Sequence, residues 1–362
     1  MNRQVIIVKI LFTRGIGDMT KISIDDLKPG MVLADDIGSL RSGAILISKG
    51  TVLNKKNIRK IHNQGVKHVS VYDESSDSEK LLENSFVIKY EILSDKMENV
   101  FTNIKFGKKI ILAEISEEID DLIVEIIQND NILGRIRQLE EKDDYTFNHS
   151  LNVSMLATMI GKWLNYSDIH IKQLALTGLF HDIGKLKIAD NIVHKPDKLT
   201  EFEFEIMKKH PIYSFNILSE TVGISKNVLI GALQHHERED GSGYPEGIKG
   251  DKIHEYAKII AVCDVYDALT SDRDYKTKAS PFYAAEILEE QSFTVLNPRI
   301  ARVFLDKIAN FYVGCKVLLS NDREGEIIYV HPQNPTRTIV KIGDKYINFL
   351  EPQEINIVDI IK

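Results

Sequence analysis

The sequence has few cysteines, no long apolar run and no excess of positive charge, and each of these absences excludes a class of protein. Its two cysteines, Cys263 and Cys315, exclude a disulfide framework and a cysteine-ligated zinc site, and they fit the reducing cytosol. No segment approaches the roughly 20 apolar residues that cross a bilayer. We therefore expect a cytoplasmic protein without a membrane span.

The charge balance also limits the partners. A net charge of −7 argues against binding a nucleic-acid polymer through a large basic surface. A small nucleotide stays compatible with it, because a metal pair and a few lysines or arginines can reverse the sign locally. With 362 residues, 43% of them apolar and 27% charged, the chain can form two or three globular domains with a sizeable core.

The first 140 residues divide into three parts. Residues 1–18 contain a short apolar stretch interrupted by Lys9, with no cleavage site, so we interpret them as an N-terminal extension, with Met19 as an alternative start. Residues 19–73 are β-rich with one helix near 55–63, which predicts a small α+β domain. Residues 74–140 open with an acidic linker and continue as connecting helices.

One of these connecting helices has a clear apolar periodicity. Isoleucines and leucines recur at three- and four-residue steps over 115–127, which predicts an amphipathic helix, and Ser116 is a candidate for its cap.

The remainder divides into a helical and a β part. Residues 141–312 read as helix after helix, with one glycine-rich loop at 240–250. Residues 313–362 contain four strand patterns separated by turns, which predict a small β domain that could serve in homodimerisation. The sequence therefore predicts a mainly α protein, with a helical bundle flanked by small α+β and β domains.

The pair His181-Asp182, followed by Ile183-Gly184-Lys185, carries the strongest functional signal. It follows an apolar run that predicts a buried helix, where an uncompensated histidine and carboxylate would be costly to desolvate. The carboxylate could bridge two metal ions while the histidine binds one. Lys185 would share their helical face and would suit an anionic substrate such as a phosphate ester. The ordinary alternative is a core histidine beside a capping aspartate.

Other candidate ligands lie before and after this pair in the chain. Each has an ordinary explanation alone: a histidine at a helix end, a solvated pair, or a capping aspartate. Taken together they favour a metal cluster over these ordinary explanations. Five of the eleven histidines adjoin apolar helical runs, and antiparallel packing would bring these runs together. We predict one ion held by His149, His181, Asp182 and Asp264, and a second held by Asp182, His210, His235 and His236.

The predicted ligands also limit the metal. Nitrogen and oxygen ligands without thiolate suit two divalent ions of iron or manganese, with zinc, cobalt and nickel as alternatives. Such a pair would lower the pKa of a shared water and would hold both oxygens of an in-line displacement. Asp182 and Lys185 would carry the catalysis, the lysine by stabilising developing charge. Asp267, one turn after Asp264, could orient a ligand or lie on the helix surface.

These motifs resemble the HD-GYP family of bacterial cyclic dinucleotide phosphodiesterases, a branch of the HD superfamily. The resemblance covers about residues 141–312, and it rests on Tyr145–Ser150, His181–Lys185, His210-Pro211, His235–Pro245 and Asp264–Arg273. It implies an HD-type helical bundle and metal-dependent hydrolysis of cyclic di-GMP to pGpG, and often on to GMP. It also implies that the seven residues above are metal ligands, that Lys185, Arg273 and Lys276 contact substrate phosphates, and that Gly243, Tyr244 and Pro245 border the pocket.

The residue types by themselves agree with part of what the resemblance implies. Glycines in the 240–247 loop allow positive φ and a close approach to a ligand, although a turn without ligand has the same composition. The guanidinium fork of Arg273 suits phosphate, and an exposed surface arginine is the alternative.

Two positions depart from the family pattern. Members with a third metal have a glutamate four residues before the first histidine, where this chain has Tyr145, so we predict two metals. Many relatives have Arg-Pro-Tyr where this chain has Arg273-Asp274-Tyr275. The extra negative charge of Asp274 puts the roles of Arg273 and Lys276 in question.

Three other functions compete with hydrolysis of cyclic di-GMP. The substrate could be cGAMP or another phosphate ester, which a nucleotide panel would reveal. The chain could bind a nucleotide or a diguanylate-cyclase partner without catalysis, although a complete ligand set argues against this. It could also sense oxygen or redox state through a di-metal site, which would produce a reversible spectral change.

Overall fold

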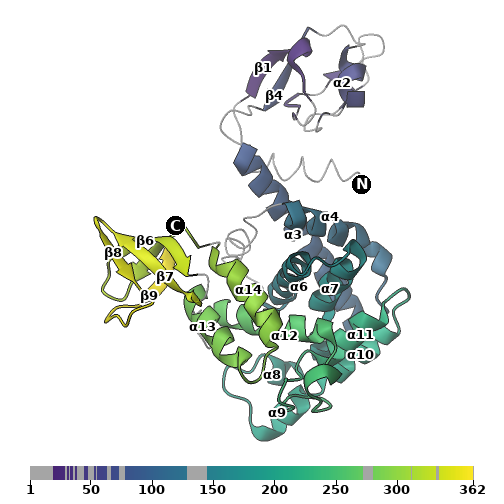
Figure 1. Ribbon diagram of the computed structural model, residues 1–362. Helices are drawn as coiled ribbons and strands as arrows, with labels where there is room; N and C mark the ends of the chain where they lie inside the picture. The colour runs from purple at the N-terminus through teal and green to yellow at the C-terminus, as the bar shows by residue number, and fades with distance from the viewer. Residues whose placement is uncertain are drawn as a thin grey trace. The chain divides into compact units, whose positions relative to one another are not determined.

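A computed structural model describes residues 19–28, 31, 33–35, 37–38, 45–47, 53, 55–62, 67–72, 78–128, 145–271, 280–310, 312–331 and 334–361 (Figure 1). Internal contacts divide the chain into two compact units, Met1–Ile88 and Lys89–Lys362. The N-terminal extension that we predicted at 1–18 lies outside the described residues. The segment boundaries predicted at 73, 140 and 312 remain predictions.

The N-terminal unit has the predicted α+β character. Strand β1 (Met19–Ser23) pairs antiparallel with β4 (His68–Tyr72), and β2 (Ile37–Gly38) pairs antiparallel with β3 (Ile45–Ile47). The short η1 (Ile24–Asp26) follows β1, and helix α2 (Lys55–His62) confirms the helix predicted near 55–63. Aliphatic side chains from these elements and from the segments between them form one small core, which includes Leu33, Leu53, Ile61 and Val71.

Two helices connect this unit with the bundle. Helix α3 spans Ser78–Lys105, so it begins within the polar stretch that we predicted as a linker. After η2 (Leu112–Glu114), α4 (Ser116–Gln128) buries Ile119, Leu122 and Ile126, which confirms the predicted amphipathic helix. The hydroxyl of Ser116, our candidate cap, instead accepts a hydrogen bond from Lys172 Nζ at 2.9 Å.

The bundle consists of α6 (Tyr145–Trp163), α7 (Asp168–Phe180), α10 (His210–Ser219), α11 (Lys226–Gln234) and α12 (Glu255–Thr270) (Figure 1). Helices α6 and α7 pack directly on each other because Gly178 has no side chain. A Cβ there would lie 2.6 Å from the Ser154 Cα. Helix α12 is buried along most of its length, as expected for a central helix.

Shorter elements connect the bundle helices. The chain passes through η3 (Ile183–Lys187), α8 (Asp190–Val193) and α9 (Glu201–Met207) between α7 and α10. The predicted glycine-rich loop joins α11 to α12 and ends in η4 (Gly250–Lys252). Helices α13 (Pro281–Ser292) and α14 (Pro298–Asn310) complete the helical part.

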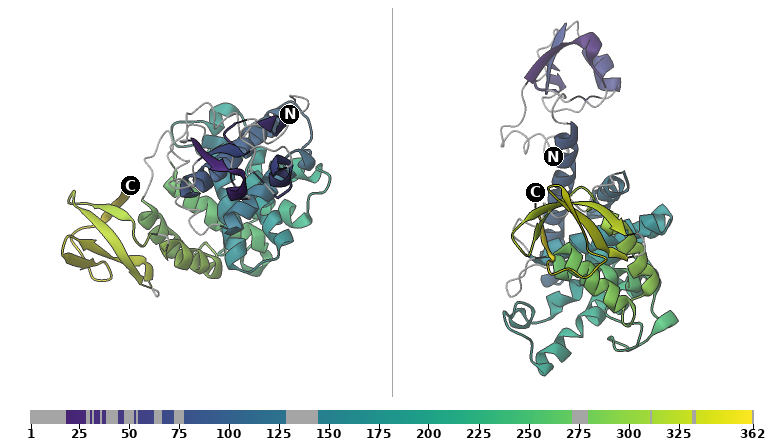
Figure 2. Two further views of the ribbon diagram at one scale, coloured as in Figure 1. Left: turned by 90° about the horizontal axis from the view of Figure 1, so that it is seen from above. Right: turned by 60° about the vertical axis from the view of Figure 1, so that its left-hand side comes forward.

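The C-terminal part is an antiparallel sheet of order β8-β7-β6-β5-β9. Four strands were predicted: β5 (Lys316–Leu319), β6 (Glu324–His331), β7 (Asn334–Ile342) and β8 (Lys345–Asn348). We did not predict the fifth, β9 (Ile357–Ile361), because Asp359 interrupts its apolar run, and it forms by pairing with β5. In both views of Figure 2 the sheet adjoins the last helices, and Arg337 of β7 pairs with Glu286 of α13 at 2.9 Å.

The predicted fold class is confirmed: a helical bundle with a small α+β unit before it and a small sheet after it. In the part of the chain that the structure describes, no helix has both the length and the apolar character needed to cross a bilayer.

Candidate metal centre

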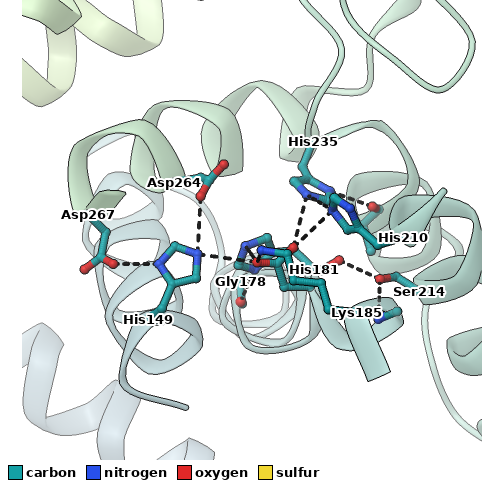
Figure 3. A network of polar contacts seen from close by, with 12 residues as sticks. His149, Gly178, His181, Lys185, His210, Ser214, His235, Asp264 and Asp267 are labelled. Atoms are coloured by element: carbon teal, nitrogen blue, oxygen red, sulfur yellow. Dashed lines mark hydrogen bonds and ion pairs between the residues drawn. The ribbon is translucent and has the colours of Figure 1, made fainter. Parts of the chain in front are cut away.

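The predicted ligands lie at helix ends and on helix faces that point toward one another (Figure 3). His149 lies on α6 and Asp264 on α12, His181 ends α7, and Asp182 begins η3. His210 is the first residue of α10, so it begins a helix and does not end one before Pro211. His235 and His236 follow α11. The fold therefore brings all seven residues together.

Asp182 lies between two groups of histidines. Its Oδ2 atom is 3.4 Å from His181 Nε2 and 3.6 Å from His149 Nε2. Its Oδ1 atom is 3.1 Å from His210 Nε2 and 3.8 Å from His235 Nε2. One carboxylate oxygen thus faces each group, as a bridging ligand requires. The two groups, Asp182 with His210, His235 and His236, and His149 with His181 and Asp264, correspond to the predicted partition.

The histidine rings are oriented by hydrogen bonds at Nδ1. His181, His210 and His235 each use Nδ1 to contact the carbonyl oxygen three residues earlier in the chain, at 2.7–2.8 Å. A carbonyl oxygen can only accept, so Nδ1 carries a proton, and Nε2 is the ring nitrogen left to face the cluster. This pattern, with one nitrogen donating to the protein and the other directed inward, is typical of metal-ligating histidines.

The inward nitrogens leave polar groups that only a cation or protons can satisfy. His210 Nε2 and His235 Nε2 lie 3.3 Å apart, where two lone pairs repel. His181 Nε2 and Asp182 Oδ1 are buried without a hydrogen-bond partner. Buried unsatisfied polar atoms are costly, and a metal ion would remove the cost at each of these positions. The residues present therefore fit a metal pair.

His149 differs from the other histidines in its partner. Its Nδ1 contacts Asp267 Oδ2 at 2.6 Å, which is the orienting contact that we predicted as one option for Asp267. Burial alone lowers the pKa of His149, but contacts with Asp182, Asp264 and Asp267 outweigh it and hold the pKa well above its usual value. Without a metal, these contacts favour the protonated form of His149 at neutral pH.

The other titrations are also shifted. Burial, reinforced by neighbouring histidines, holds the pKa values of His235 and His236 well below the usual value, so both rings are neutral. Burial raises the pKa of Asp182, but Lys185 and His181 more than reverse this and hold it well below its usual range. The pKa of Asp264 is likewise held low, because its contacts with His149 outweigh burial. Neutral imidazoles beside ionised carboxylates are the protonation states that metal binding needs.

Close packing fixes η3 against α10. A Cβ on Gly184 would lie 2.0 Å from the His210 carbonyl oxygen and 2.4 Å from the Ser214 nitrogen. The Ser214 hydroxyl donates to the His181 carbonyl oxygen at 2.7 Å and accepts from the Gly184 N–H at 2.9 Å. Asp182 and His210, which belong to different elements, are thereby held at a fixed separation.

Lys185 is placed to act on an anion beside the cluster. Its Nζ atom lies 2.5 Å from Asp182 Oδ2, and the side chain lines an open cavity of about 460 Å³. Five of the seven predicted ligands also line this cavity: His149, Asp182, His210, His236 and Asp264. Pockets for small organic ligands are typically about 300–1,000 Å³, so a nucleotide-sized molecule could reach the cluster.

The glycine-rich loop contributes one wall of the cavity. Tyr244 lines it and stacks on the His236 ring, with centroids 4.6 Å apart and planes at 24°. Gly243 supports the loop from behind, because a Cβ there would lie 2.5 Å from the backbone of 236–238. Gly243 and Pro245 are therefore beside the cavity wall without lining it.

Several residues of the site were not predicted. The buried Glu237 accepts hydrogen bonds from the Glu246 and Gly247 N–H groups at 2.7 and 3.2 Å and closes the loop. Its position directly after the paired histidines was the available signal. Lys195 and Lys198, between α8 and α9, line the cavity, and their charges were visible in the sequence. The Nζ atom of Lys195 forms an ion pair with Glu203 Oε2 at 2.6 Å.

Other predicted residues are not placed. Arg273, Asp274 and Lys276 lie outside the described residues. Tyr145 begins α6, but its side chain is not described, so the prediction of two metals based on it stays a prediction.

The chain is similar to a known domain family and to several proteins of named function. Residues 132–300 match the HD domain family. The chain is 33% identical over 244 residues to a cyclic di-GMP phosphodiesterase of Pseudomonas aeruginosa, covering 67% of this chain and 59% of that protein. It is 32% identical over 262 residues to a cyclic di-GMP phosphodiesterase of Thermotoga maritima, covering 66% and 69% respectively.

A further relative has a different named substrate. A 3′3′-cGAMP-specific phosphodiesterase of Vibrio cholerae is 34% identical over 186 residues, covering 51% of this chain and 39% of that protein. The chain thus spans between about two fifths and about two thirds of the length of these relatives.

Proposed function

This chain belongs to the HD-GYP family, and we propose that it is a metal-dependent phosphodiesterase that hydrolyses cyclic di-GMP to pGpG, with GMP as a further product. The observation that carries the proposal is the position of Asp182, whose two oxygens each face a separate group of histidines beside a nucleotide-sized cavity. Hydrolysis would lower the level of the second messenger in the cytoplasm.

The residues divide between two divalent ions, with iron or manganese preferred. His149, His181 and Asp264 would hold one ion, His210, His235 and His236 the other, and Asp182 would bridge them. Ligands of nitrogen and oxygen without thiolate support these metals. When bound, such a pair lowers the pKa of a coordinated water and neutralises phosphate oxygens.

The chain supplies a positive group and a stacking surface for the substrate. Lys185 lines the cavity beside Asp182, and we propose that its ammonium group stabilises the negative charge that develops on the phosphate or the leaving 3′ oxygen. Tyr244, already stacked on His236, offers its other face to a base. Arg273 and Lys276 are proposed as further phosphate contacts, and Gly243 and Pro245 as residues that border the substrate.

A mixed cyclic dinucleotide is the second candidate substrate. The Vibrio cholerae relative named for 3′3′-cGAMP supports it. Cyclic di-GMP and cGAMP share both phosphates and differ in one base, so the metal cluster and Lys185 would serve either. Homodimerisation through residues 313–362 and association with a diguanylate cyclase are secondary proposals.

The test is turnover with metal counting. The protein is purified without oxygen, loaded with iron or manganese, and given cyclic di-GMP, cGAMP and other nucleotides, and the products are separated by chromatography. We expect conversion of cyclic di-GMP, and we expect His181→Ala and Asp182→Ala to lose metal and activity together. Full turnover by either variant with its metal retained would show that the cluster is not the catalytic site.

A further inference from the structure

A second cavity, of about 480 Å³, lies apart from the metal centre and has no role in the proposed function. It shares no lining residue with the metal cavity. Three segments form it: the turn after α3 around 104–109, the end of η3, and the face of α10 that carries Tyr213 and Ile217. The cavity has the size of a pocket for a small organic ligand.

The mouth of this cavity is positively charged. Lys108, Lys109 and Lys187 line it, against a single carboxylate, Glu220. Lys109 pairs with Glu220 at 3.4 Å, and both side chains are exposed. Lys108 contacts only the neutral Asn103 among the described residues. Lys187 has no ion-pair partner among them.

These lysines come from segments that are far apart in the sequence, so it is the tertiary fold that gathers them at the cavity. Lys108 and Lys187 are brought together from elements almost 80 positions apart, in a chain whose net charge is −7. Positive charge concentrated in a hollow attracts anions, and the ammonium groups can donate to phosphate oxygens.

One part of the cavity wall is apolar. Ile104 is 3% exposed and forms its floor, and Tyr213 and Ile217 are half-buried in its wall. An aromatic ring beside aliphatic side chains provides a surface for a flat ring system. A bare inorganic ion would leave this surface uncovered.

We propose that this cavity binds a nucleoside monophosphate. The phosphate would contact Lys108 and Lys187, with Lys109 nearby, and the base would lie on Tyr213 and Ile217. The proposal does not depend on which ester the metal centre hydrolyses.

A ligand in this cavity would affect the metal centre, because the same elements line the cavity and carry residues of the metal centre. Lys187 ends η3, the same element that presents Lys185, and Tyr213 lies on α10 one turn after His210. The contact between Gly184 and α10 leaves no room for independent movement of these elements. A ligand that favours one position of α10 is therefore coupled to the metal ligands, and the coupling is reciprocal.

The test locates binding by hydrogen–deuterium exchange in the full-length, metal-loaded protein. GMP and AMP are the probes, and guanosine and inorganic phosphate are the comparison compounds. We expect GMP to slow amide exchange in peptides covering 104–109 and 213–220. These peptides are distinct from 192–199, which line the metal cavity. The readout does not require turnover, so a failure of the proposed function would be seen separately.

Matched variants complete the test. Lys108→Gln combined with Lys187→Gln should abolish this protection and weaken GMP binding, measured by calorimetry, about tenfold or more, because two charge-assisted contacts are lost. Lys316→Gln combined with Lys345→Gln, at exposed lysines of β5 and β8, should leave both unchanged.

Four results would overturn the proposal. GMP could fail to protect the two peptides, or the double variant could behave as the control does. Guanosine could protect as well as GMP, which would exclude a role for the phosphate. Inorganic phosphate could protect as well as GMP, which would exclude a role for the apolar wall.

Discussion

The contact between Gly184 and α10 allows a quantitative prediction for Gly184→Ala. The added Cβ would lie 2.0 Å from the His210 carbonyl oxygen, whereas real Cβ atoms essentially never approach another atom within 3.0 Å. Either η3 or α10 must therefore move by about 1 Å. The backbone of Gly184 is outside the positive-φ region, so alanine has no conformational strain of its own there.

This displacement is large compared with the tolerance of a metal site. Metal–ligand distances are defined to within about 0.2 Å, and the clash falls on the backbone of His210, the first residue of α10. We expect the group containing His210, His235 and His236 to lose its ion, while His149, His181 and Asp264 keep theirs. Metal analysis should find close to one ion per chain in place of the proposed two. Overpacking should also cost about 1–3 kcal/mol of stability.

The assay is metal counting after loading with manganese, combined with thermal unfolding. Gly161→Ala is the matched control, because its Cβ would meet side-chain atoms, Leu174 Cδ1 at 3.0 Å and Ile171 Cγ1 at 3.3 Å, and would approach no backbone atom closer than 3.8 Å. Should Gly184→Ala fail to fold, Ser214→Ala breaks the same connection without a steric clash, at about 1–3 kcal/mol for the unpaired groups. Two ions bound to Gly184→Ala with wild-type affinity would refute the reasoning.

Three further predictions concern the ligand set and its charges. Asp267→Asn should weaken metal binding about 10- to 100-fold without removing a ligand, because His149 loses its orienting carboxylate; an unchanged affinity by metal titration would contradict this. Because the pKa of His149 is raised, this histidine must release a proton before its group binds metal near pH 7. The metal affinity of that group should therefore rise about tenfold per pH unit. The neutral imidazoles after α11 should show no such dependence until the pH is more acidic. Calorimetry in buffers of different ionisation enthalpy would detect that proton, and its absence would refute the assignment. Lys185→Met should keep both ions and lower the rate of hydrolysis about 100-fold or more, and full rate in a steady-state assay would remove Lys185 from the reaction.

The sequence predicted much of the fold because its local patterns agree with its packing. The repeated apolar residues of α4 and of strands β5 to β7 recur on one face in the sequence, and most of them are buried. Strand β9 was not predicted although four of its five residues are isoleucine or valine; Asp359 interrupts the apolar run, and pairing with β5 places the segment in the sheet. The start of α3 at Ser78 was missed for a related reason, since a polar composition does not prevent a helix from extending.

For the site, residue types and spacing predicted which residues would lie together as candidate ligands, but not how they are held. Histidine and aspartate side chains adjoining apolar helices are costly unless they are paired, so their presence alone indicated a metal cluster. The contacts that orient them come from elsewhere. Ser214 and Gly184 connect α10 to η3, and Glu237 closes the loop through backbone N–H groups.

The sequence by itself determined the helical character of the chain and the identity of the candidate ligands, and it suggested the anionic class of the proposed substrate, because these follow from side-chain chemistry and local periodicity. Only the tertiary structure decided that one oxygen of Asp182 faces each group of histidines, that Asp267 contacts His149, and that lysines from two distant segments line a second cavity. Those features depend on distances between helices, and such distances are fixed by packing over the whole bundle.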